Sequence, residues 1–123
     1  MYSWNVDLAQ VIGSDGAPPP KREFRDRYEF RSYVRTVLVT ERLLATPELI
    51  ERGRNYLDRF VKDDPRQQNI YRLWTEVLQL PVRELVSALL ADDHRGSTLR
   101  ETAPVFDVIP VEAVNARLRQ VVQ

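Results

Sequence analysis

The sequence contains no cysteine and only one histidine, His94. Without cysteine there can be no disulfide, no thiolate metal ligand and no cysteine nucleophile. A single histidine leaves little for a metal centre or for proton transfer by imidazole. The chain also lacks a glycine-rich phosphate loop, an H-E-x-x-H pair, a G-x-S-x-G turn and zinc-ligand spacing. We therefore expect a non-enzymatic protein without a metal site or a cofactor.

Long apolar runs are missing as well. A helix that crosses a bilayer needs roughly 20 consecutive apolar residues, and the longest runs here are far shorter. Residues 1–20 include Asp7 and Asp15 and have neither a basic start nor an apolar centre, unlike a secretory signal. These absences predict a cytoplasmic protein that makes no contact with a membrane.

Charge of one sign does not predominate, because 18 basic residues balance 18 acidic ones. A neutral chain is not expected to coat nucleic acid or an anionic membrane by bulk electrostatics. Only Lys21 and Lys62 are lysines, so 16 of the basic residues are arginines. Arginine suits protein interfaces and ion-pair networks. The codon composition of the source genome can produce the same bias, and we favour that explanation.

A length of 123 residues predicts one domain with a core of its own. Residues 1–20 form a separate piece, because Gly13 to Pro20 is turn and polyproline material. The arm before it either docks as a short strand or frays, and its alternation is too short to decide. We therefore divide the chain into an arm and linker at 1–20 and a helical domain at 21–123.

A helical hairpin at 64–92 organises the rest of the chain. Asp64-Pro65 predicts a capped helix start, and Pro81 predicts a corner, since proline cannot continue a helix but suits its first turn. Apolar side chains follow helical spacing in both halves. They are Ile70, Leu73, Trp74, Val77 and Leu78, then Val82, Leu85, Val86, Leu89 and Leu90.

Residues 24–40 fit either a strand or a helix, and the length of the run without a turn signal favours a helix. Thr46-Pro47-Glu48 predicts the start of the next helix, with Thr46 as its cap. On that helix we expect Gly53 to mark the close crossing of a neighbouring helix. The predicted buried face comprises Leu49, Ile50, Gly53, Leu57, Phe60 and Val61.

Beyond the hairpin, Gly96 is available for a left-handed position and Ser97 can cap a short helix from Thr98. Residues 104–110 are extended between two prolines and should lie across the core. Pro110 opens a last helix with Val111, Val114, Leu118 and Val121 on one face. The predicted fold is an all-α bundle of about five helices, with an N-terminal arm and a proline-bounded extended segment near the C-terminus.

Parts of the chain between Tyr33 and Arg119 carry a family resemblance. The relevant stretches are the Pro-Glu-Leu-Ile start at 47–50, the Tyr-Arg-Leu-Trp helix at 71–74, and Leu-Arg-Glu-Thr-Ala-Pro-Val-Phe at 99–106. The chain resembles a group of small helical bacterial proteins that look like partners in toxin–antitoxin-type gene pairs. The resemblance implies a non-enzymatic protein that binds another protein. Operator DNA is a further candidate partner. Residues 21–35 depart from the pattern, so no role there is inherited.

The basic stretch 21–35 has two interpretations. Six basic residues stand against three acidic ones and are interleaved with aromatic residues, which suits contacts with phosphates and bases. In the other interpretation the acids pair with arginines and the aromatic rings enter the core, and we favour it because the excess charge is small. The nucleic-acid alternative would use Arg22, Arg25, Arg27, Arg31 and Arg35.

Two further patterns suggest chemistry only weakly. Asp63-Asp64 and Asp92-Asp93 flank helix boundaries, where aspartate most often caps a helix. The corner at Pro81 could be a DNA-binding helix-turn-helix with Arg83, Glu84 and Ser87 facing outward. One arginine beside one glutamate offers few donors to base edges, so this is not favoured.

The sequence as a whole predicts a small protein-binding or regulatory module, antitoxin-like by resemblance. Its partner would be another protein or a second copy of the chain, with DNA a less favoured partner. Arginine and aromatic side chains on irregular backbone are the usual anchors of such contacts. The predicted partner-binding residues are Trp4, Arg95, Arg100 and Phe106.

Overall fold

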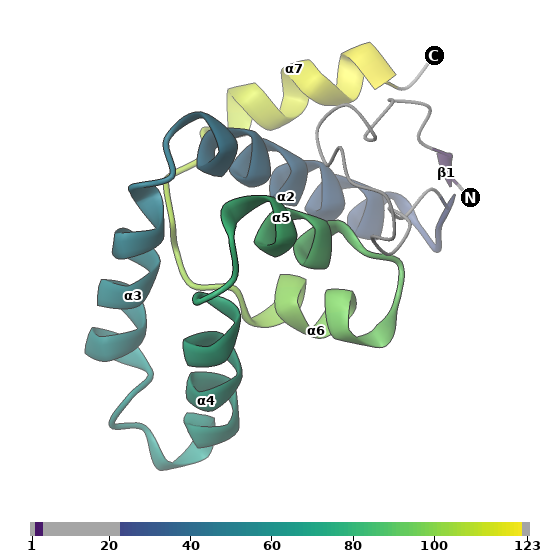
Figure 1. The fold of residues 1–123 in the computed structure, drawn as a ribbon. Helices are drawn as coiled ribbons and strands as arrows, with labels where there is room; N and C mark the ends of the chain where they lie inside the picture. The colour runs from purple at the N-terminus through teal and green to yellow at the C-terminus, as the bar shows by residue number, and fades with distance from the viewer. Residues whose placement is uncertain (1, 4–22, 122–123) are drawn as a thin grey trace.

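The computed structural model describes residues 2–3 and 23–121 (Figure 1). Trp4 and Arg22, two of the predicted site residues, lie outside these ranges. The described part is mostly helical, which confirms the all-α prediction. Its elements are β1 (Tyr2–Ser3), β2 (Glu23–Phe24), α2 (Arg27–Ala45), α3 (Leu49–Phe60), the 3₁₀ turn η1 (Pro65–Gln67), α4 (Gln68–Val77), α5 (Val82–Leu90), α6 (His94–Thr102) and α7 (Val111–Val121).

Helix α2 confirms the helical interpretation of the ambiguous stretch. The side chain of Asp26 caps it, because its Oδ1 accepts a hydrogen bond from the N–H of Glu29 at 2.8 Å. Phe30, Val34 and Val37 are fully buried on one face of the helix. Just before it, β2 pairs with β1 in an antiparallel ladder, so Tyr2–Ser3 docks as a short strand.

Helix α5 lies at the centre of the bundle, packed against α2 and α6, while α7 packs on the other side of α2 (Figure 1). The predicted corner is confirmed, since α4 ends at Val77 and Pro81 precedes the first residue of α5. Burial of α5 follows the predicted stripe. Its buried apolar residues are Leu85, Val86, Leu89 and Leu90.

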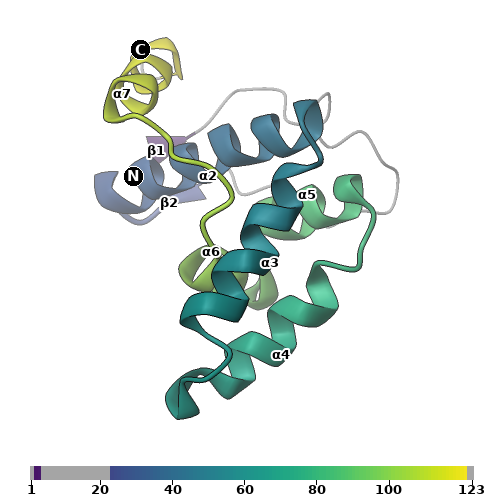
Figure 2. The same ribbon diagram turned by 90° about the vertical axis from the view of Figure 1, so that its left-hand side faces the viewer.

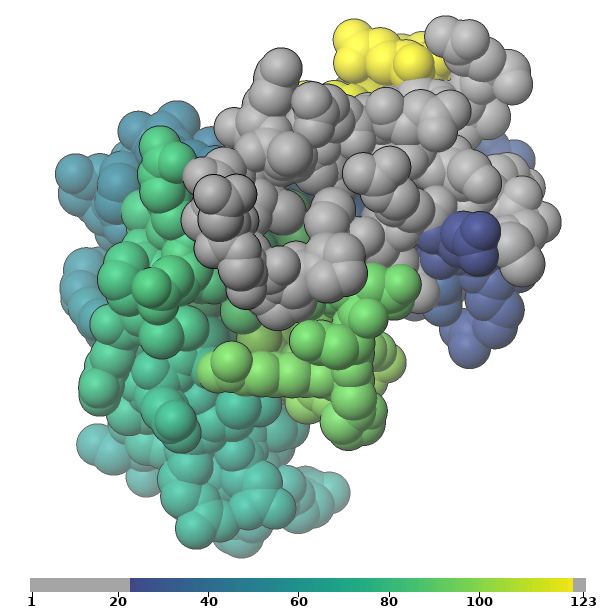
Figure 3. All heavy atoms as spheres, turned by 45° about the vertical axis from the view of Figure 1, so that its right-hand side comes forward, coloured from purple at the N-terminus to yellow at the C-terminus, as the bar shows by residue number. Residues whose placement is uncertain are grey.

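Helices α3 and α4 form a hairpin that projects from the rest of the domain, with its teal tip at the bottom of Figures 1 and 3. The hydroxyl of Tyr71 donates a hydrogen bond to Asp58 Oδ1 at 3.0 Å and ties the two helices together. The prediction that Phe60 is buried is wrong: 55% of this side chain is exposed. Phe60 is the last residue of α3, and its ring lies beside that of Tyr56, with centroids 4.9 Å apart, and 5.2 Å from the guanidinium carbon of Arg59.

Between α6 and α7 the chain runs extended across the bundle (Figure 2). Pro104, Phe106 and Ile109 are buried and Val105 and Val108 are exposed, so the side chains largely alternate between core and solvent. The prediction that this segment crosses the core is thus confirmed for one set of its side chains only.

The close approach at Gly53 is made by this extended segment. The prediction that a neighbouring helix makes it is wrong. A Cβ atom at Gly53 would lie 2.4 Å from Cε1 of Phe106, so only glycine leaves room for the ring.

Two predicted helix caps, Thr46 and Ser97, are wrong. Thr46 ends α2, its N–H bonded to the carbonyl of Arg42 at 2.8 Å, and α3 begins without a side-chain cap. Helix α6 begins at His94 because Asp93 Oδ1 accepts a hydrogen bond from the N–H of Gly96 at 2.6 Å. Gly96 therefore lies inside the helix, and Ser97 is not a cap.

Candidate functional site

The described residues predicted to bind a partner do not form one surface. Phe106 is 2% exposed and packs edge-on against Trp74, with ring centroids 6.0 Å apart, so it is a core residue and not a contact residue. Arg95 is exposed on the first turn of α6. Arg100 is half-buried and engaged with the end of a neighbouring helix. Only Arg95 is freely accessible among these three.

Arg100 and Tyr33 together satisfy the carboxyl-terminal end of α5. Arg100 Nη1 donates hydrogen bonds at 2.8 Å to the carbonyls of Leu89 and Ala91. The hydroxyl of Tyr33 donates to the carbonyl between them, Leu90, at 2.7 Å. The guanidinium also lies 5.1 Å from the centroid of the Tyr33 ring. Helix carboxyl ends leave unpaired carbonyls and a partial negative charge, which this pair compensates.

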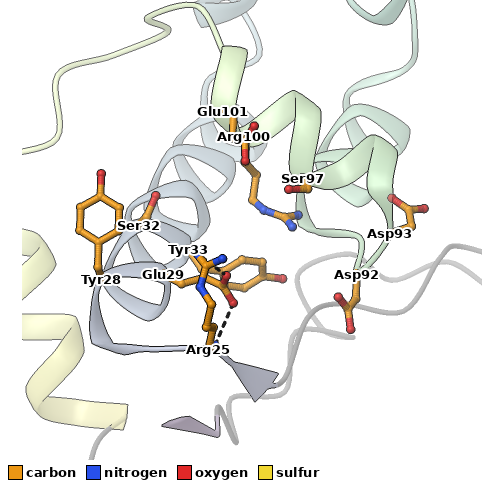
Figure 4. Close-up of a pocket in the computed structure, with 10 residues that line it drawn as sticks. All are labelled: Arg25, Tyr28, Glu29, Ser32, Tyr33, Asp92, Asp93, Ser97, Arg100 and Glu101. Atoms are coloured by element: carbon orange, nitrogen blue, oxygen red, sulfur yellow. Dashed lines mark hydrogen bonds and ion pairs between the residues drawn. The ribbon is translucent and has the colours of Figure 1, made fainter. Parts of the chain in front are cut away.

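A cavity of about 380 Å³ opens beside this pair (Figure 4). Burial lowers the pKa of the Arg100 guanidinium, which nevertheless stays protonated at neutral pH. Arg25 pairs with Glu29 across 3.6 Å at the other side of the cavity. Asp93 is engaged in capping α6. The charged groups here are largely engaged in internal contacts. They stabilise the fold and leave few groups to bind or react with a ligand.

In the described ranges, no three histidine or acidic side chains lie close enough together to bind a metal ion. The aspartate pairs act at helix boundaries, as predicted. Asp64 Oδ1 accepts a hydrogen bond from the N–H of Arg66 at 2.9 Å and opens η1. Asp93 does the same for α6. His94 is exposed on that helix.

The helix-turn-helix interpretation loses one of its three predicted surface residues. Ser87 is only 4% exposed, because it lies on the packed side of α5, whereas Arg83 and Glu84 are exposed. The prediction that Ser87 faces outward is therefore wrong. A recognition helix must present a continuous polar face to the groove of DNA. Helix α5 is instead enclosed by α2 and α6 over much of its surface.

The arginines of the basic stretch divide into paired and free groups. Arg25 lies near Asp26 and Glu29, and Arg31 Nη1 donates to Asn115 Oδ1 of α7 at 2.7 Å. Arg27 and Arg35 are exposed. Positions 27, 31 and 35 recur every four residues and share one stripe of α2.

The aromatic rings of the same stretch also divide. Phe24, Phe30 and Tyr33 are buried, as the favoured interpretation predicts. Tyr28 is 80% exposed, which that interpretation did not foresee.

Two adjoining cavities, of about 270 and 300 Å³, follow this side of α2 and share Ser32 and Arg35. We call them the α2 groove. Its opposite wall consists of residues 103–107, Ile109, Val111 and Val114, with Leu89 and Arg100 at one end. Figure 2 shows this wall passing from α6 to α7. The α2 side is lined by Tyr28, Arg31, Ser32, Arg35, Thr36 and Val39.

Ion pairs fix the far wall of the groove in place. Asp107 Oδ2 lies 2.8 Å from Arg42 Nη1, and its Oδ1 lies 3.3 Å from Arg52 Nη1, so one carboxylate joins the extended segment to α2 and α3. The hydrogen bond from Arg42 is the main reason that the pKa of Asp107 is lowered. Arg117 of α7 pairs with both oxygens of Glu41 on α2 at 2.6 and 2.8 Å.

Apolar side chains stand exposed around the groove. Tyr28 and Val111 line one of its cavities and Val105 lines the other, with 80%, 59% and 49% of their surfaces exposed. Two other large apolar residues in the described ranges are exposed, Val108 and Phe60, and neither lines a cavity of the groove. We call Tyr28, Val105 and Val111 the groove rim.

Sequence reasoning missed the groove rim because it placed Tyr28 and the valines in the core. The alternation of Val105, Phe106, Asp107, Val108 and Ile109 was the available signal, since successive side chains of an extended segment point to opposite sides.

Comparisons with known proteins found no match to this chain. No protein-family model matches the chain. No curated protein matches it. No solved structure matches it either. No helix in the described ranges has the length and the apolar composition needed to cross a bilayer.

Proposed function

We propose that this chain is a small, non-enzymatic protein-binding module with a regulatory role in the bacterial cytoplasm, antitoxin-like in the sense of the sequence resemblance. It acts by presenting the α2 groove and its rim to another protein. The observation that carries this proposal is the exposure of Tyr28, Val105 and Val111 around one groove. Exposed apolar side chains gathered at one place are typical of protein contact sites.

The chemistry of the groove supports binding in preference to catalysis. Its charged lining residues are arginines, together with Asp107. Arginine does not release its proton at neutral pH, and the Asp107 carboxylate is engaged by Arg42 and Arg52. A general acid or base works best with a pKa near the working pH. None of these groups suits that task.

The framework of the groove also favours recognition. Its two walls are joined by the Asp107 ion pairs and by the bidentate contact between Arg117 and Glu41. A surface already held in its binding geometry loses less conformational entropy on association than a loose one. The groove rim is therefore a prepared surface for a partner.

The test is to co-express the chain with the product of the adjacent gene and to determine the mass of the purified complex by size-exclusion chromatography with light scattering. We expect a complex of defined stoichiometry. Replacing Tyr28→Ser and Val111→Ser together should weaken it at least tenfold, since two rim side chains lose apolar contact area. Phe60→Ser is the matched control, because Phe60 is exposed on the α3–α4 hairpin. Absence of any complex would refute the proposal for this partner.

A second candidate is a nucleic-acid-binding regulator. The observation that favours it is the stripe of Arg27, Arg31 and Arg35 on α2, with Tyr28 exposed beside it. Arginines can contact phosphates and an exposed ring can stack on a base. If this candidate is correct, duplex DNA shifts in low salt, and Arg27→Ala with Arg31→Ala abolishes the shift. Arg22 belongs to the same hypothesis but lies outside the described residues.

A further inference from the structure

We propose that the α2 groove recognises an acidic, apolar segment of the partner protein, with a carboxylate on Arg35 and apolar side chains against the groove rim. This inference rests on the proposed function and specifies the chemistry of the partner. It depends on three properties of the groove: an unengaged cation, the balance of charge in the lining and the aliphatic character of the rim.

Arg35 is the unengaged cation. It is exposed, lines both cavities of the groove, and makes no hydrogen bond or ion pair with any residue in the described ranges. The other two lining arginines are occupied: Arg31 by Asn115, and Arg100 by carbonyls of α5. An arginine has five N–H donors in a planar fork that matches a carboxylate. Arg35 therefore offers its full set of donors to a ligand.

The balance of charge in the lining favours an acidic ligand. Three arginines line the groove, and Asp107 is its only acidic lining residue among those described. That carboxylate accepts hydrogen bonds from Arg42, Arg52 and the N–H of Val108, so its charge is compensated. Arg31 contacts a neutral amide and keeps its charge. The groove consequently presents net positive charge to a ligand.

The rim distinguishes a protein segment from nucleic acid. Two of its three side chains are valines, which gain free energy by burying apolar surface and offer nothing to a phosphate. Only Tyr28 could stack on a base. A peptide that carries an acidic residue beside apolar ones satisfies both parts of the surface. A sugar–phosphate backbone would satisfy Arg35 alone.

The dimensions of the groove suit a short segment. Its lining on α2 runs from Tyr28 to Val39, and a helix rises about 1.5 Å per residue, so this wall is about 16 Å long. A segment of about three helical turns, or about five extended residues, covers that length. Peptides of 12 residues are therefore long enough to contain the complete recognition sequence.

The experiment selects a library of random 12-residue peptides against the full chain by phage display and measures the affinity of synthetic copies by fluorescence anisotropy. We expect enriched peptides to carry Asp or Glu beside apolar residues and to bind more weakly as salt rises. Arg35→Glu should weaken binding at least tenfold, because it replaces attraction with repulsion, and Arg35→Gln should weaken it less. Arg72→Glu, on α4 and outside the groove, is the matched control and should change affinity less than twofold. Thermal melts establish that each variant is folded.

Four outcomes would overturn the inference. They are the absence of any enriched peptide, enrichment without acidic residues, affinity unchanged by Arg35→Glu, and an NMR footprint outside the groove. Labelled 20-nucleotide single strands and duplexes that bind in an Arg35-dependent manner would assign the groove to nucleic acid instead. A dimer of the chain alone that dissociates on Arg35→Glu would assign it to a second copy.

The complex with the adjacent gene product distinguishes this inference from the proposed function. If that complex survives Arg35→Glu but is lost with Tyr28→Ser and Val111→Ser, the chain binds a protein through the rim and the acidic-segment inference fails alone. If neither a complex nor a peptide is found, both fail. Competition between an enriched acidic peptide and the partner would support both.

Discussion

The ring of Phe106 occupies the space beside Gly53 that any side chain at this position would need. A Cβ on Gly53 would lie 2.4 Å from Cε1 and 2.7 Å from Cδ1 of the ring. This contact attaches the extended segment to α3, and the same segment forms a wall of the α2 groove. The glycine thus allows the groove wall to sit close to the bundle.

We predict that Gly53→Ala destabilises the protein by about 1–3 kcal/mol, the usual cost of overpacking. The sign is informative, because alanine in place of a helical glycine ordinarily stabilises by about 0.5–1 kcal/mol. Urea denaturation measures the change. The double variant with Phe106→Leu should recover part of the loss, so the two changes are not additive. A more stable Gly53→Ala protein would contradict the close contact.

Most of the fold could be predicted from sequence because helical periodicity reports which face of a segment is apolar. Pro81 and Asp64 marked their boundaries correctly for the same local reasons. The errors concern features that depend on distant residues. Gly53 indicated a close approach, but only the folded chain shows that Phe106 makes it. One error is local instead: Asp93 and Ser97 are both good capping residues four positions apart, and Asp93 caps α6.

The carboxyl-terminal end of α5 provides a second prediction. Tyr33→Phe removes the hydrogen bond to the carbonyl of Leu90, so we expect a loss of about 1 kcal/mol. Arg100→Met removes two hydrogen bonds from a charged donor and should cost more, about 2–3 kcal/mol. Both values come from urea denaturation.

Arg95→Met is the control for this pair, because Arg95 is exposed on the same helix, and it should change stability by less than about 0.5 kcal/mol. An Arg100→Met variant as stable as the control would mean that the α5 carbonyls do not need this donor.

The candidate site was less accessible from sequence than the fold. Arg100 was selected as a partner-binding residue because arginine is frequent at interfaces, whereas its partners are carbonyls of its own chain. Arg35 belongs to a stretch of six basic residues, and its sequence position does not set it apart from the others. In the folded chain Arg25 and Arg31 have partners, and Arg35 is left to bind a ligand. A single sequence does not reveal which arginines the fold engages, because the groups that accept their hydrogen bonds are up to 84 positions away.

Ser87 supplies a third prediction. Its side chain is 4% exposed, and its hydroxyl oxygen has no hydrogen-bond partner in the described part of the chain. A buried polar group without a partner retains its desolvation cost, so Ser87→Ala should stabilise the protein by about 1 kcal/mol. The midpoint of urea denaturation should rise.

Thr40→Val is the matched control, because Thr40 is also buried in a helix but its hydroxyl donates to the carbonyl of Val37 at 2.7 Å. This variant should be destabilised or unchanged. A loss of stability in Ser87→Ala would show that its hydroxyl is satisfied.

Asp107 gives the chain a predictable response to acid. The hydrogen bond from Arg42 holds the pKa of Asp107 below its ordinary value, with further help from the N–H of Val108. A carboxyl group whose pKa is depressed by folding stabilises the folded state above its unfolded pKa of about 3.9, and that stabilisation is lost as pH falls through the folded value. Asp107→Asn should therefore lower stability at pH 7, and the difference from the native chain should shrink toward zero as the pH falls below about 4.

Urea denaturation of both proteins from pH 7 to pH 3 measures this difference. Arg42→Gln removes the main cause of the pKa shift, so Asp107→Asn should have a smaller effect in that background. The same acid range should weaken acidic-peptide binding to the α2 groove for two reasons: the carboxylates of the peptide become protonated, and the wall that carries Val105 loses an attachment to α2 and α3. A stability difference that stays constant down to pH 3 would show that the Asp107 carboxylate does not hold the wall in place.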